Sequence, residues 1–133
     1  METLVQKTYY DSGKIKTMTD VVNGEKNGKH FLYAENGQLL VESFYNDGRS
    51  HGKWTEYYEN GQLAEEGEFI NDEYHVYNFW TENGDQLLKD GTGKTIRKFG
   101  ATESEIYEQY FENGQFKGEK KINDITYEKF IPD

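Results

Sequence analysis

The fold is indicated by a stretch that occurs twice, as GKHFLYAENGQLLVE at residues 28–42 and as GKWTEYYENGQLAEE at residues 52–66, an offset of 24 residues without a gap. A third copy keeps Thr81-Glu-Asn-Gly84, and a fourth keeps Phe111-Glu-Asn-Gly114-Gln. A fixed period of this size is typical of repeat proteins, in which each unit packs mainly on its neighbours. We therefore expect one repeat domain over residues 1–133, with units at approximately 5–28, 29–52, 53–76, 77–100 and 101–130.

Each unit carries two turn signals. Asn-Gly pairs favour the type I′ turn, in which both central residues have positive φ, and they occur at 36–37, 60–61, 83–84 and 113–114. A second set of turn signals occurs at 23–24, 46–48, 71–72 and 123–124. The runs between them are rich in aromatic and β-branched residues, which favour strands. The sequence predicts an all-β fold, an elongated single-layer antiparallel meander of tandem β-hairpins.

The sequence leaves the local structure open at two places. Residues 101–109 could form a strand or a short helix, and we expect a strand. A type I′ turn at 60–61 places Tyr58 opposite Leu63 and Trp54 opposite Gly67, and an aromatic ring over a glycine stabilises a strand pair. A bulge at the turn would exchange the two faces of the hairpin.

The composition fits a thin sheet better than a thick core. Hydrophobic residues make up 34% of the chain and aromatic residues 16%, so aromatic rings supply most of the area that can be buried. Tyrosine tolerates half-exposed positions because its hydroxyl can stay hydrated. Disordered chains are poor in aromatic residues, so we expect an ordered sheet.

The net charge of −10 argues against binding to nucleic acid or to an anionic membrane surface, since both require basic residues. It suits a basic protein partner, and it equally suits a protein that uses its charge only for solubility. The chain has no cysteine, which excludes disulfides. Neither an apolar leader nor an apolar run of membrane-spanning length occurs, so a cytoplasmic location is expected.

Candidate catalytic and metal sites fail on spacing. The segment 91–95 (GTGKT) resembles a phosphate-binding loop, but Leu88 stands where the motif requires its first glycine and no helix pattern follows. Among the histidines, His51 and His75 lie one repeat apart, roughly 10 Å, which is too far for one zinc ion. His30 stands alone. We expect no metal and no cofactor.

Acidic residues recur before each Asn-Gly pair and gather at Glu65, Glu66 and Glu68. Paired carboxylates can act as general acid and base only in a pocket that shifts one of their pKa values. A sheet with two open faces offers no obvious pocket. We therefore expect these carboxylates to be solvated and the protein not to be an enzyme.

The frame Gly48-Arg-Ser-His-Gly52-Lys-Trp54-Thr-Glu-Tyr57-Tyr58-Glu-Asn60-Gly61-Gln-Leu63 resembles the MORN repeat in its bacterial variant. The resemblance covers about residues 9–130, is strong at 28–75 and weakens at 76–110. The segment 87–93 (LLKDGTG) is similar to one found in the YwqK-like antitoxin family. That resemblance implies a small cytoplasmic immunity protein or antitoxin that neutralises a cognate toxin by occluding its active or binding surface.

We therefore expect this chain to be a monomer that binds another protein. The expected partner is a basic toxin domain. The alternative is a MORN-type structural scaffold or membrane-associated module. Tyrosine and tryptophan are frequent interface residues, although a thin sheet also needs them for its own cohesion. The alternation at 77–80 cannot bury every aromatic ring on one face, so part of it should be exposed. The predicted contact residues are Trp54, Tyr57, Tyr58, Glu65, Glu66, Glu68, Tyr77, Phe79 and Trp80.

Overall fold

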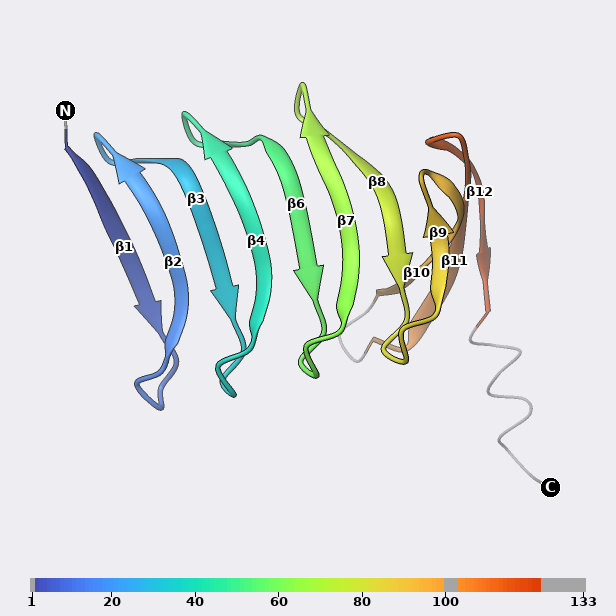
Figure 1. Ribbon diagram of the computed structural model, residues 1–133, viewed down its shortest axis with the longest axis horizontal. Coiled ribbons are helices and arrows are strands. Elements are labelled where there is room, and N and C mark those ends of the chain that lie inside the picture. The colour runs from blue at the N-terminus through green and yellow to red at the C-terminus, as the bar shows by residue number, and fades with distance from the viewer. Residues whose placement is uncertain (1, 100–102, 123–133) are drawn as a thin grey trace.

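The computed structural model describes residues 2–99 and 103–122, and it places them in one β-sheet without helices (Figure 1). The strands are β1 (Thr3–Tyr9), β2 (Ile15–Val22), β3 (Glu25–Tyr33), β4 (Leu39–Asn46), β5 (Arg49–Ser50), β6 (Gly52–Tyr57), β7 (Leu63–Ile70), β8 (Glu73–Trp80), β9 (Gln86–Lys89), β10 (Thr92–Phe99), β11 (Glu105–Glu112) and β12 (Gln115–Lys121). Strands adjacent in sequence pair antiparallel, except that β5 and β6 both pair with β4. The predicted meander of hairpins is confirmed.

The ambiguous segment 101–109 is resolved in part. Residues 105–109 belong to β11, so they form the expected strand rather than a helix. Residues 101–102, like the predicted turn at 123–124, lie outside the described residues.

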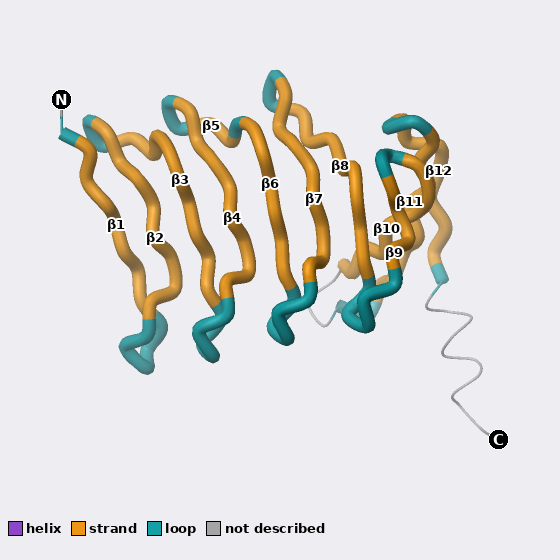
Figure 2. Tube along the Cα trace, viewed as in Figure 1, coloured by secondary structure: helices purple, strands orange, loops and turns teal. Residues whose placement is uncertain are grey.

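The loops gather at two ends of the sheet, and the two ends use different turns (Figure 2). At one end, only the glycine of each Asn-Gly pair has positive φ, and Gly61 has φ 89°. The Gly61 amide donates to the carbonyl of Tyr58 and the Tyr58 amide donates to the carbonyl of Gln62, each at 2.9 Å. This is a three-residue hairpin loop closed by a left-handed glycine. The predicted type I′ turn is therefore wrong at 36–37, 60–61 and 83–84.

The asparagine of this loop has a different role, which is to link neighbouring units. Asn60 Oδ1 accepts a hydrogen bond from the Gln62 amide at 2.9 Å, while its Nδ2 donates to the carbonyl of Glu82 in the next unit at 3.2 Å. Asn36 makes the same two contacts one unit earlier. Asparagine recurs here because it joins adjacent hairpin ends, not because it adopts positive φ.

Type I′ geometry occurs at the opposite end of the sheet. Both central residues have positive φ at 23–24, 47–48, 71–72, 90–91 and 113–114. The prediction therefore holds for 113–114. The second set of turn signals thus marks two-residue turns, which are tighter than the three-residue loops at 36–37, 60–61 and 83–84.

The loop geometry also sets the strand register. Trp54 lies opposite Gly67, as predicted. The prediction of Tyr58 opposite Leu63 is wrong, because the register shifts by one residue near the loop and Tyr57 takes that place. Tyr58 belongs instead to the loop, where its hydroxyl donates to the carbonyl of Trp80 at 2.6 Å.

The sheet does not stay flat towards its C-terminal end. Strands β8 to β12 curl so that β10 and β11 turn back towards β6 and β7 (Figure 1). The core lies inside this curl and consists of Val76, Phe79 and Leu88, with Ile96 and Phe111 packed against it. We call the face inside the curl the inner face and the opposite one the outer face.

Candidate binding groove on the inner face

The curl creates two adjoining hollows on the inner face, with volumes of about 430 Å³ and about 620 Å³. Glu56, Glu65 and Arg97 line both, so the hollows form one continuous depression that we call the inner groove. The first hollow has four aromatic rings in its lining, contributed by Trp54, Phe69, Tyr74 and Phe111. The second is more polar and includes Glu82 and Lys98.

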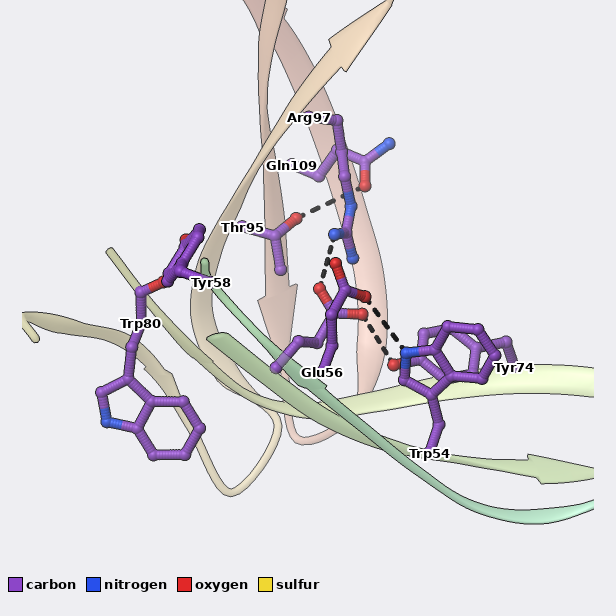
Figure 3. Close-up of polar contacts among 9 residues, drawn as sticks. Trp54, Glu56, Tyr58, Tyr74, Trp80, Thr95, Arg97 and Gln109 are labelled. Atoms are coloured by element: carbon purple, nitrogen blue, oxygen red, sulfur yellow. Dashed lines mark hydrogen bonds and ion pairs between the residues drawn. The ribbon is translucent and has the colours of Figure 1, made fainter. Parts of the chain in front are cut away.

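An ion pair in the inner groove connects strands that are far apart in the sequence. Glu65 on β7 is only 4% exposed, and Arg97 on β10 donates from Nη1 to its Oε1 at 2.5 Å (Figure 3). The hydroxyl of Tyr74 donates to Glu65 Oε2 at 2.6 Å. The guanidinium of Arg97 also lies 5.8 Å from the ring centre of Phe79, within the range of a cation–π interaction. These contacts hold the curl against the flatter part of the sheet.

The Tyr74 hydroxyl is fixed as a donor by its surroundings. Burial raises the pKa of Tyr74 far above its ordinary value of 10.0, and the neighbouring charge of Glu65 raises it further. The phenol therefore stays protonated at any physiological pH. Two donors thus hold the buried Glu65 carboxylate, as a buried charge requires.

Glu56 is the second carboxylate of the inner groove, and its surroundings differ. It lies directly opposite Glu65 in the register of β6 and β7. Trp54 Nε1 donates to its Oε1 at 3.2 Å, but among the described residues no ion pair involves Glu56. Burial raises the pKa of Glu56 and the charge of Glu65 adds a smaller increase, while the Trp54 hydrogen bond and the charge of Arg97 act in the opposite direction. The first hollow thus contains two carboxylates and one guanidinium, which is paired with Glu65.

The wall beside Glu56 is built from aromatic rings. Trp54, Phe69 and Tyr74 form a mutual cluster with ring centres 5.0–6.1 Å apart, and Phe111 lines the hollow from β11. Gly67 makes this packing possible because a Cβ there would come within 2.6 Å of the His75 carbonyl oxygen and overlap the Tyr74 ring.

The predicted contact residues do not share one surface. The inner-face members are Trp54, Tyr58, Glu65 and Phe79. The outer-face members are Tyr57, Glu66, Glu68, Tyr77 and Trp80, as the register of the sheet and the hydrogen bonds of Tyr77 to Glu68 and of Asn78 to Glu66 show. Figure 3 shows the Trp80 side chain directed away from the groove.

Exposure within the aromatic segment 77–80 does not extend to Phe79, which is 6% exposed and belongs to the core. Glu65 is buried rather than solvated, because the curl covers it and supplies Arg97 as its counter-ion. A sheet with two open faces was expected to lack a pocket, and the inner groove corrects that expectation.

The sequence reasoning missed Glu56 and Arg97. Glu56 could have been found, because alternation along a strand places it on the same face as Trp54. Arg97 gave no such signal, since 32 residues separate it from Glu65 and the repeat spacing breaks between them.

The fold is that of a tandem β-hairpin repeat protein, a class whose extended surfaces serve as binding or scaffold modules. The family model for the MORN repeat variant matches residues 2–23, 26–47 and 50–71, which correspond to three successive hairpins. The first half of the chain therefore consists of tandem MORN repeats of the variant type, which confirms that part of the resemblance. The comparisons with curated proteins and with solved structures find no match. Within the described residues, no helix has the length and apolarity needed to cross a membrane.

Proposed function

We propose that this chain is an antitoxin or immunity protein that binds a basic toxin domain through the inner groove and so masks the toxin's working surface. The observation that carries the proposal is the charge of the inner groove, in which Glu56 lies beside aromatic walls and forms no ion pair with any of the described residues. Aromatic rings and carboxylates together suit a basic protein surface. The resemblance of residues 87–93 to the YwqK-like antitoxins supports the same function, with the cytoplasm as its place of action.

The overall charge supports rapid binding. At a net charge of −10, the chain attracts a cationic partner over distance, which raises the association rate at low salt. Binding is favoured over catalysis because Arg97 and Tyr74 already hold the Glu65 carboxylate, which leaves it poorly placed to transfer protons. We therefore propose a monomer that acts by occlusion and not as an enzyme.

The test is a toxicity assay with the protein encoded beside this chain in its native genome. Expression of that neighbour alone should arrest growth, and co-expression with this chain should restore it. Glu56→Lys should abolish rescue, whereas Glu73→Lys changes the net charge equally at a side chain that is 80% exposed and should leave rescue intact. Thermal unfolding checks that both variants fold. The proposal is refuted if the neighbouring protein is harmless and does not bind this chain.

One observation favours the alternative function of a scaffold. Strand β1 lies at the edge of the sheet, and all of its residues are exposed, including Leu4 at 59% and Val5 at 51%. An exposed apolar edge strand can add a strand from another chain. Scaffold function predicts oligomers that Val5→Lys dissolves, and binding to anionic vesicles in its membrane-associated form. A monomer in light scattering that ignores such vesicles excludes this alternative.

A further inference from the structure

We propose that the aromatic half of the inner groove is a pocket for a guanidinium group, with Glu56 as its counter-ion and Trp54 as its principal aromatic wall. This inference rests on the proposed function only in naming an arginine side chain of the toxin as the source of that group. The pocket itself follows from contacts within this chain.

The first argument is the volume and composition of the hollow. It has about 430 Å³, and Trp54, Phe69, Tyr74 and Phe111 contribute rings to its lining. Rings of this kind pack against the methylene stem of a long side chain and attract a cation to their faces. An arginine side chain satisfies both properties.

The second argument is charge. With both carboxylates ionised, Glu56 and Glu65 carry two negative charges, and Arg97 neutralises one of them. The remaining carboxylate, on Glu56, accepts a hydrogen bond from Trp54 Nε1 and forms no ion pair among the described residues. Burial disfavours this charge and raises the pKa of Glu56, so an incoming cation restores an interaction that water can no longer provide. A neutral or anionic ligand offers no such compensation.

The third argument is an arrangement that the molecule already contains. Arg97 combines a carboxylate contact to Glu65 with a position 5.8 Å from the ring centre of Phe79. Glu56 and Trp54 offer an incoming cation the same two kinds of group. The carboxylate of Glu65 offsets the charge of Arg97 and so reduces its repulsion of a second guanidinium.

Arginine is favoured over lysine for a geometric reason. A guanidinium is planar, stacks on aromatic rings and is more weakly hydrated than an ammonium group, so it enters an aromatic pocket more readily. It can also donate to a carboxylate through two N–H groups at once. The expected order of affinity is therefore arginine, then lysine, with no binding of the neutral isostere citrulline.

The test uses the whole chain with Trp80→Phe, which leaves Trp54 as the only tryptophan and changes only an outer-face residue. N-acetyl-arginine amide is titrated at about pH 8 while the indole N–H resonance of Trp54 is followed by NMR, since that N–H donates to Glu56. We expect a saturable shift with a dissociation constant on the order of millimolar, several-fold weaker binding of the lysine analogue and none of the citrulline analogue. An equal shift with citrulline overturns the proposal.

Two substitutions test which residues form the arginine pocket. Glu56→Gln keeps an acceptor for Trp54 and should weaken arginine binding at least tenfold, whereas Glu73→Gln, at an exposed position, should not change it. If Glu56→Gln fails to fold, Phe111→Leu removes one ring of the lining and should weaken binding several-fold. Unchanged affinity in a folded Glu56→Gln variant overturns the pocket.

The outcome is separate from that of the proposed function. Arginine binding together with a neighbouring protein that is harmless and unbound supports the pocket and removes only the antitoxin. Absence of arginine binding overturns the pocket, even where the neighbour is toxic and neutralised.

Discussion

Replacing Arg97 with methionine tests whether one ion pair holds the curl of the sheet. The variant keeps most of the aliphatic stem and removes the guanidinium, so Glu65, 4% exposed, keeps only the hydrogen bond from Tyr74. Removing one partner of a fully buried pair costs about 3–5 kcal/mol. The side chain of Arg97 is 27% exposed and Tyr74 still donates, so we expect the lower value of about 2–3 kcal/mol.

That loss is measurable by thermal unfolding. For a chain of 133 residues it corresponds to a decrease in the melting temperature of about 7–11 °C, followed by circular dichroism at pH 7. Lys94→Met is the matched control on the same strand, because Lys94 pairs with Glu108 at 2.6 Å but is 38% exposed. An exposed pair contributes about 1 kcal/mol or less, so the control should shift the melting temperature much less.

A double variant identifies the cause. Glu65→Gln together with Arg97→Met removes both charges, and it should be more stable than Arg97→Met alone because no unpaired carboxylate remains buried. The reasoning is refuted if Arg97→Met unfolds within about 0.5 kcal/mol of the wild type, or if the double variant is no more stable than the single one.

Three further changes test other parts of the structure. Gly67→Ala forces a Cβ against Tyr74 and should cost about 1–3 kcal/mol in urea unfolding, and an unchanged free energy of unfolding contradicts the packing described. Glu56→Gln should stabilise the fold at pH 7, because the raised pKa of Glu56 means that its ionised form disfavours folding. This advantage should disappear as the pH falls below the ordinary carboxyl value of 4.5, and a constant difference across the pH range counts against a buried charge. Tyr58→Phe removes the bond to the Trp80 carbonyl and should cost about 1 kcal/mol in thermal unfolding, whereas no change makes that bond irrelevant.

The regular part of the fold could be predicted from the sequence because its information is local and repeated. The 24-residue period and the strand runs established the meander, and the pairing of Trp54 with Gly67 followed from counting along one hairpin. The turn type at 60–61 was wrong for a physical reason. Asn60 uses its side chain to bridge to the carbonyl of Glu82, a contact that a single hairpin does not reveal.

The inner groove could be predicted only in part. Trp54, Tyr58, Glu65 and Phe79 were among the predicted contact residues and line the groove, but they were expected on an open face. The curl depends on Arg97 and on the core around Leu88, which lie where the repeat is irregular. The spacing of motifs along a regular or an irregular segment does not reveal which residues of the two segments contact each other.

The position of the curl also determines how the chain can change its length. A 24-residue unit inserted or deleted before Gly52 alters the number of hairpins and the strand that pairs with β6, yet the lining residues from Trp54 to Phe111 keep one another as neighbours. The same insertion between Glu65 and Arg97 separates the two ends of the ion pair. Duplication of repeats can thus vary the reach of this protein while its binding groove is inherited unchanged.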